Sequence, residues 1–116
     1  MRETHVKLEN VGIVIATRIL KKNDGDVVTI LMGKPEKIPD DTDYFCPYQI
    51  TGLSNDKVRC TYGVDAFQAL LLTLERISID LHTSEEYKSK SLKLFEDDYN
   101  LGFPIPDFIS DSKSNE

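Results

Sequence analysis

The sequence predicts an α+β fold: a four-stranded antiparallel β-meander, then one long amphipathic helix packed on the sheet, then an extended C-terminal strap. Three observations predict it. Four short segments rich in β-branched residues come first and are separated by turn residues. One apolar stripe at helical spacing follows them, and a proline-rich apolar segment lies near the C-terminus.

The strands are expected where β-branched and aromatic residues are bounded by residues that favour turns. Asn23-Asp24-Gly25-Asp26 tolerates positive φ and predicts a hairpin between the first two strands. Residues 34–43 hold two prolines and four acids, so we expect a loop there. Pro47 predicts an edge or a bulge in the third strand. The expected strands are 11–20, 27–32, 44–51 and 58–62.

The long helix is the clearest element, and we expect it to cover the apolar face of the sheet. Asp65 can cap its start, with Gln68 at the N3 position of a capping box, and it should end near His82 or Thr83. Burying one Leu-sized side chain contributes roughly 1.5–3 kcal/mol. The main source of stability is therefore expected to be one stripe of apolar residues: Phe67, Leu70, Leu71, Leu74, Ile77 and Leu81.

Two further apolar residues of this helix, Leu72 and Ile79, lie nearly opposite the stripe. We expect residues 101–109 to fold over them as an extended strap, because large exposed apolar patches are uncommon on monomers. The alternative is that a partner covers them. Between helix and strap, residues 84–100 are expected to form a polar connector with a short helix around 92–95.

Length and composition favour a single domain, since the chain has 116 residues with 40% hydrophobic and 29% charged residues. We expect one domain over residues 1–109 and a disordered acidic tail over 110–116. No apolar run is long enough for a membrane span or a signal peptide, which predicts a cytoplasmic location.

Cys46 and Cys60 are too few for a disulfide framework or a zinc site. They are expected to be small buried side chains, and a cross-strand disulfide is the alternative.

The acidic residues are clustered. The formal net charge is −6, and residues 96–116 hold six acids against the single Lys113. A second cluster, Asp40, Asp41 and Asp43, lies in the predicted loop. Nucleic acid is an unfavourable partner, because binding to phosphates requires a basic patch that this sequence lacks.

No motif in the sequence predicts catalysis or metal binding. His5 lies near the terminus, and His82 at the helix end suits the helix dipole. The acids of the loop lack the spacing of a calcium site, and the glycines are isolated, so none forms a phosphate-binding loop. Free amides at the helix start could bind an anion, but Asp65 as the cap would occupy them. We expect no catalytic activity, no cofactor and no metal.

Three segments carry a resemblance to a known family: Cys46-Pro47-Tyr48-Gln49-Ile50-Thr51-Gly52, Gly63-Val64-Asp65-Ala66-Phe67-Gln68-Ala69-Leu70-Leu71-Leu72 and Leu101-Gly102-Phe103-Pro104. Together they resemble small bacterial domains of unknown function. Those domains have a Cys-Pro-aromatic-x-Ile-x-Gly strand, a Gly-x-Asp-x-x-Gln-Ala-Leu helix start and a Gly-Phe-Pro ending. The likeness covers most of residues 11–106. It implies no activity, so no functional residue is carried over.

In size and acidity the chain also resembles, by type, the immunity proteins of contact-dependent growth inhibition, which neutralise bacterial toxins. Many such toxins are basic nucleases, and an acidic inhibitor gains association rate and specificity from matched charge. We therefore expect a non-catalytic protein-binding domain whose partner is a toxin domain, with no membrane partner. The first alternative is a structural or small-molecule-binding module with a pocket between helix and strap, and the second is an enzyme of unknown type. The expected contact residues are Asp40, Asp41, Asp43, Tyr44, Glu96, Asp97, Asp98 and Tyr99.

Overall fold

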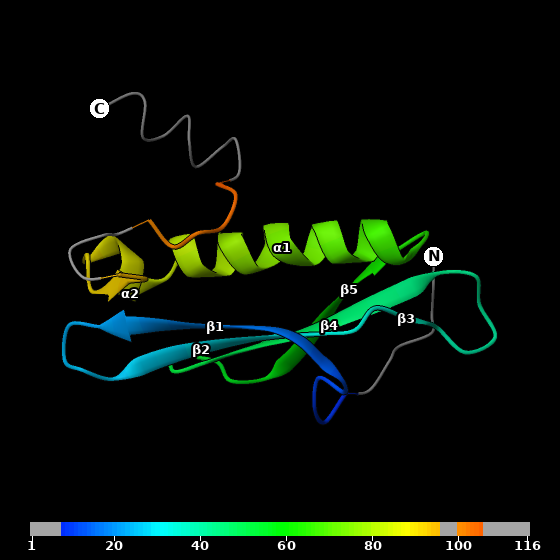
Figure 1. Ribbon diagram of the computed structural model, residues 1–116, viewed down its shortest axis with the longest axis horizontal. Coiled ribbons are helices and arrows are strands. Elements are labelled where there is room, and N and C mark those ends of the chain that lie inside the picture. The colour runs from blue at the N-terminus through cyan, green and yellow to red at the C-terminus, as the bar shows by residue number, and fades with distance from the viewer. Residues whose placement is uncertain (1–7, 96–99, 106–116) are drawn as a thin grey trace.

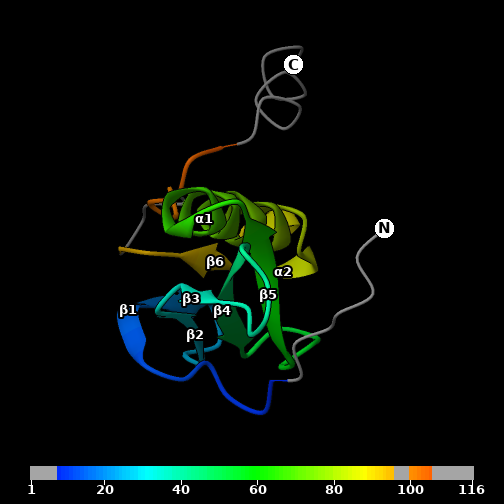
Figure 2. The ribbon, with the colours of Figure 1, turned by 90° about the vertical axis from the view of Figure 1, so that its right-hand side faces the viewer.

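A twisted antiparallel sheet and one main helix form the two layers of the computed structural model, which describes residues 8–95 and 100–105 (Figure 1). Figure 2 shows the layers end-on, with the helix lying across one face of the sheet. The elements in chain order are β1 (Val14–Lys22), β2 (Val27–Gly33), β3 (Glu36–Lys37), β4 (Tyr44–Thr51), β5 (Val58–Gly63), α1 (Ala66–His82), α2 (Glu85–Lys88) and β6 (Leu92–Lys93).

The four long strands pair in the predicted meander, β1 with β2, β2 with β4, and β4 with β5, all antiparallel. The predicted number of four strands was wrong, because the described residues form a sheet of six. The short β3 pairs with the start of β4, and the short β6 pairs with the end of β1. Strands of two residues are too short to show an alternating pattern, so their pairing depends on contacts made in the folded chain.

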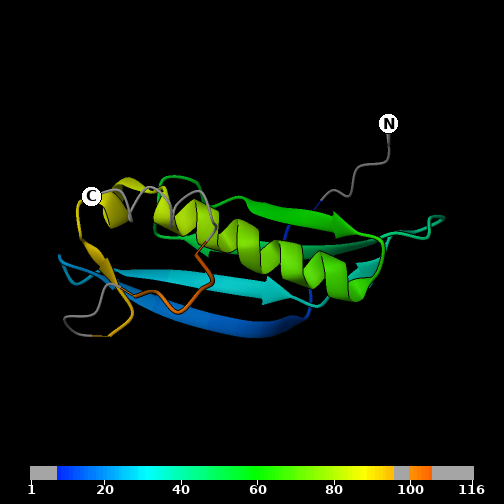
Figure 3. The ribbon, with the colours of Figure 1, turned by 90° about the horizontal axis from the view of Figure 1, so that it is seen from above.

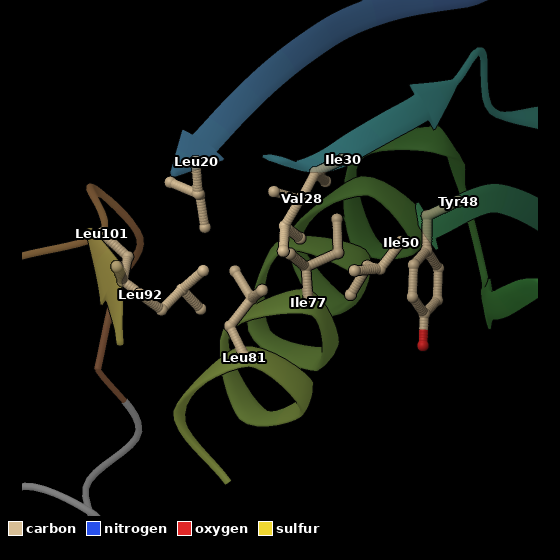
Figure 4. Packing of buried hydrophobic residues seen from close by; sticks show 9 residues of the cluster. All are labelled: Leu20, Val28, Ile30, Tyr48, Ile50, Ile77, Leu81, Leu92 and Leu101. Atoms are coloured by element: carbon tan, nitrogen blue, oxygen red, sulfur yellow. The ribbon is translucent and has the colours of Figure 1, made fainter. Parts of the chain in front are cut away.

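The core lies between α1 and the sheet (Figure 4). Side chains alternate along β2 and β4, and alternate residues are buried: Val28, Ile30, Met32, Cys46, Tyr48 and Ile50. Ile77 and Leu81 of α1 pack against this face and are 1% and 0% exposed. The core is closed near the end of α1 by buried residues from three further segments: Leu20, Leu92 and Leu101.

The first strand begins at Val14, three residues later than predicted, and carries a register shift between Val14 and Ala16. The segment around Val11, just before β1, does not continue the strand. Val11 is buried, and its carbonyl oxygen lies so close to Gly33 that a Cβ there would be 2.1 Å away. Residues around Val11 thus cross the sheet at a glycine instead of extending β1.

The predicted helix is confirmed over Ala66–His82, and so is its cap. Asp65 has an extended backbone, and its Oδ1 accepts a hydrogen bond of 2.8 Å from the amide of Gln68. Gln68 Oε1 reaches back to accept from the Val64 amide at 2.7 Å, one residue before the cap itself. The Asp65 carboxylate therefore takes the donor that an anion would otherwise bind.

The predicted apolar stripe is correct for the second half of α1 and for the partly buried Leu70, and it is wrong for Phe67 and Leu71. Phe67 is 79% exposed and Leu71 is 60% exposed, whereas Ala69 and Thr73 are buried against the sheet. The reason is the close approach of α1 to β5. A Cβ on Gly63 would lie 2.4 Å from the Ala69 nitrogen, so only small side chains fit between helix and strand there.

Hydrogen bonds hold the same contact one turn further along α1. The hydroxyls of Thr61 and Thr73 lie 2.6 Å apart, so one donates to the other, and both lie within hydrogen-bond distance of the Ala69 carbonyl oxygen, at 2.9 and 2.8 Å. This small and polar contact orients the first half of α1 so that its larger apolar side chains face away from the sheet.

The connector differs from its prediction. The short helix expected around 92–95 is absent from the described residues; the chain forms α2 at Glu85–Lys88 and strand β6 at Leu92–Lys93 instead. Ser84 caps α2, since its hydroxyl accepts from the Tyr87 amide at 3.2 Å. Leu92 is fully buried, so the burial of its side chain in the core determines that this segment forms a strand.

The strap is described through residue 105 and lies beside α1, over β1 and β2 (Figure 3). Leu101 is buried in the core, and Arg18 Nη1 donates to the carbonyl oxygens of Leu101 and Gly102 at 3.2 and 2.8 Å. Ser78 of α1 donates to the Pro104 carbonyl oxygen. Leu72 is still 40% exposed, so the expected cover over it is not made by these residues. Residues 106–109 of the predicted strap and the predicted tail at 110–116 lie outside the described residues.

Candidate functional site

The predicted loop between β3 and β4 holds three of the expected contact acids in a defined turn. Ile38 is fully buried and anchors it, and its amide donates to the Asp43 carbonyl oxygen at 2.8 Å. Asp41 Oδ1 accepts from the amides of Thr42 and Asp43 at 2.6 and 3.1 Å. Asp40 is exposed and has a φ of 60°, which Asp tolerates better than most residues. We call residues 40–43 the acidic loop.

The remaining expected contact residues divide into two groups. Tyr44 is half-buried and packs on a small cluster of Met32, Cys46 and Ala69, so its ring helps to hold β4 against α1. The other four lie outside the described residues: Glu96, Asp97, Asp98 and Tyr99.

At the same end of the molecule as the acidic loop lies an exposed apolar surface that sequence reasoning missed. Val64, Phe67 and Leu71 are 68%, 79% and 60% exposed, and Phe67 and Leu71 are one helical turn apart. Figures 1 and 3 both place the start of α1 at the same end of the molecule as the acidic loop. We call these three residues the Phe67 surface. The missed signal was the line of small residues Ala69 and Thr73, which continues into Ile77 at helical spacing and marks the true sheet-facing side.

Asp80 of α1 contacts three polar side chains and joins the helix to the sheet through two of them. Its Oδ2 accepts from the Tyr48 hydroxyl at 2.8 Å and lies 3.5 Å from Arg59 Nη1, and its Oδ1 lies 3.4 Å from Arg76 Nε. Burial, and then the hydrogen bond to Asp80 and its charge, raise the pKa of Tyr48 to about 12. Tyr48 is thus a neutral hydrogen-bond donor at ordinary pH, which suits a structural link between sheet and helix.

An open pocket of about 310 Å³ lies beside this network, between the β4–β5 turn and the junction of α1 and α2. Lys57 and Arg59 line one part of it, and Glu85 and Glu86 line another. The pocket is at the opposite end of the molecule from the acidic loop (Figure 1).

The potentially reactive side chains are held in structural contacts. Burial raises the pKa of the Cys46 thiol, whose Sγ donates to the Gly33 carbonyl oxygen at 3.4 Å. Both cysteines are free: Cys46 is opposite Thr61 in the register and Cys60 is opposite Pro47, which places the two on opposite faces of the sheet. The alternative of a cross-strand disulfide is therefore wrong.

His82 is 5% exposed and sits at the end of α1, as predicted. Its Nδ1 lies 2.8 Å from the Ser78 carbonyl oxygen and 3.1 Å from the Ser78 hydroxyl, and its ring meets Tyr87 edge-on at 4.7 Å between centroids. These contacts fix the ring inside the protein. His5 lies outside the described residues.

Within the described part of the chain, no three His, Cys, Asp or Glu residues are grouped in a way that could hold a metal ion. No helix in residues 8–95 or 100–105 is long and apolar enough to cross a membrane.

The comparisons with known proteins agree with the motif resemblance. No curated protein and no solved structure matches the chain. One family model does match, over residues 16–105, which runs from β1 through the described strap and includes all three motif segments. The chain therefore belongs to the family described as domain of unknown function DUF6968.

Proposed function

We propose that this chain is a non-catalytic protein-binding domain of the immunity type, which neutralises a basic toxin domain by direct contact. The observation that carries the proposal is the Phe67 surface. An aromatic side chain that is 79% exposed, beside two other exposed apolar residues, is what a binding hot spot presents before its partner arrives.

The acidic loop supplies the charged rim of the proposed interface. Stable interfaces combine an apolar centre with a polar border, and complementary charge raises the association rate. Asp40 is exposed, the acidic loop lies at the same end of the molecule as the start of α1 (Figure 1), and the turn around Asp41 is closed by its own hydrogen bonds. The rim is thus already ordered, which lowers the entropy cost of binding. A partner that fits has an apolar pocket for Phe67 and basic residues around it.

The proposal is tested with the protein encoded immediately upstream of this chain as the partner. We expect a complex whose affinity falls with salt, because a charged rim is screened. Phe67→Ala is expected to weaken it by about 2 kcal/mol or more, as removal of a hot-spot residue does. Asp40→Asn is expected to lower mainly the rate constant of association, with a smaller effect on dissociation. Growth of cells that co-express both proteins gives the functional readout.

Two matched controls separate the interface from general surface effects. Phe95 is 66% exposed and Asp26 is exposed on the β1–β2 turn at the other end of the molecule. Phe95→Ala and Asp26→Asn should leave binding unchanged. Equal losses from Phe67→Ala and Phe95→Ala would count against the interface. A homodimer of this chain that Phe67→Ala dissociates would show that the surface serves self-association and would overturn the proposal.

A further inference from the structure

A second site lies on the helix side of the sheet, between α1, the strap and the first two strands. It is a cavity of about 260 Å³ that is open to solvent on the side of Ala16 and whose walls are mostly apolar. It shares no residue with the acidic loop or the Phe67 surface and is argued independently of the proposed function. The lining residues that carry the argument are Ala16, Arg18, Met32, Leu74, Ile77 and Phe103.

The cavity exists because α1 does not cover the whole sheet. The helix packs on β4 and β5, while β1 and β2 lie under the strap (Figure 3). Small Ala16 and the passage of the strap through Gly102 leave a hollow beside Ile77 and Leu74. Ligand sites are mostly apolar clefts with a few fixed polar groups, so an open apolar pocket next to the core is a natural place for an apolar ligand.

One cationic group, Arg18, lines the cavity and is held in place. Its Nη1 donates to two carbonyl oxygens of the strap, and its Cζ lies 4.9 Å from the centre of the Phe103 ring. Gly102 has a φ of +78°, and a Cβ there would lie 2.5 Å from Arg18 Nη1, so glycine makes room for the guanidinium.

Arg18 has no carboxylate partner within the described part of the chain, where the arginine ion pairs are those of Arg59 and Arg76 with Asp80. Its Nε and Nη2 donors make no hydrogen bond to the described residues either. A guanidinium that is fixed by neutral carbonyl groups keeps its charge and its remaining donors for an anion, and its fork of N–H groups matches a carboxylate.

We propose that the cavity binds a small amphiphilic monocarboxylate, with its alkyl chain against Met32, Leu74 and Ile77 and its carboxylate on Arg18. Pockets for drug-sized ligands measure roughly 300–1,000 Å³, so an open pocket of about 260 Å³ suits a smaller ligand with a short or medium alkyl chain. The ligand class is therefore a medium-chain fatty acid or a carboxylate of similar shape.

The test is titration of the full chain with sodium octanoate below its micelle concentration, followed by calorimetry and by backbone amide chemical shifts. We expect binding at a single site, with shifts that cluster at residues 16–18, 74–77 and 102–104. Octan-1-ol and sodium butanoate should bind more weakly, because one lacks the charge and the other lacks the chain.

Three variants decide the assignment. Arg18→Gln should lower the affinity for octanoate by about tenfold or more, since it removes the charge-assisted hydrogen bonds to the carboxylate. Arg76→Gln, which loses the same charge outside the cavity, should change nothing. Ala16→Phe fills the hollow on a strand that accepts aromatic residues and should abolish binding even if Arg18→Gln disturbs the strap. No saturable binding, equal affinity for octanol, or full binding by Ala16→Phe would overturn the proposal.

Discussion

Truncation of Ile77 and truncation of Phe67 are expected to have very different effects on stability, although both residues belong to one apolar stripe in the sequence. Ile77 is 1% exposed and touches the main core, whereas Phe67 is 79% exposed. Ile77→Ala removes three buried carbons, for which transfer accounts for about 2.4 kcal/mol. The cavity left behind adds to this, so we expect a loss of about 3–4 kcal/mol in the free energy of unfolding.

Phe67→Ala removes a side chain of which only about one-fifth is withdrawn from water. Full burial of a phenylalanine contributes up to about 3 kcal/mol, so the expected loss is about 0.5 kcal/mol. Equilibrium urea unfolding, followed by far-UV circular dichroism, measures both variants against the wild type. An unchanged denaturant slope shows that the midpoints report stability alone.

A loss for Phe67→Ala as large as the loss for Ile77→Ala would refute this account. It would mean that Phe67 is buried against the sheet, as the simple helical stripe predicts. In that case the Phe67 surface and the protein-binding proposal built on it would both fail.

Three further predictions follow from single contacts. Gly63→Ala places a Cβ 2.4 Å from the Ala69 nitrogen and is expected to cost about 1–3 kcal/mol of stability by urea unfolding. Asp65→Ala removes the cap and is expected to cost about 1 kcal/mol, measured in the same way. Because the folded pKa of Tyr48 is about 12 and its ordinary value is 10.0, its contribution is complete below pH 10 and is lost as the pH rises towards 12. In an ultraviolet titration Tyr48→Phe should remove a tyrosine that titrates near pH 12 and flatten this fall in stability; an unchanged profile would contradict the assignment.

Local sequence patterns were enough to predict the elements that depend on them. The β1–β2 turn contains Gly25 with a φ of +92°, as the hairpin signal implied. The alternating residues of β2 and β4 and the cap at Asp65 are determined by neighbours in the chain, so the bounds of these two strands and the helix start follow from sequence.

Features that depend on distant contacts could not be predicted in the same way. Whether Phe67 or Ala69 faces the sheet is decided by how closely β5 approaches α1, and the only local hints are small residues: Gly63 on β5, and Ala69 and Thr73 on α1. The same holds for Leu92: its strand pairs with β1 because the core accepts the side chain, against a helical expectation from its neighbours. Tertiary packing outweighs weak local preference in both cases.

One part of the candidate site, the acidic loop, was predicted from composition, because several Asp residues beside prolines indicate an exposed loop with negative charge. The Phe67 surface was not predicted, because Phe67 and Leu71 fit the helical spacing that is typical of buried residues. The cavity beside Arg18 was anticipated only as a position between helix and strap. Its charge depends on an arginine from β1, more than 80 residues away in the chain from the carbonyl groups that hold it.

The closure of the core by Leu92 and Leu101 has a consequence for synthesis on the ribosome. β1 is made first and can pair with β2 early, but its last residues find their second partner strand, β6, only after residue 93 has emerged, and the core cluster that contains Leu20 is completed by Leu101. A nascent chain that stops before this point leaves an apolar end of the sheet uncovered, and such surfaces aggregate readily. We therefore expect folding to be completed late in translation, because β6 and the segment with Leu101, which pack against the end of β1, are among the last parts of the domain to be synthesised.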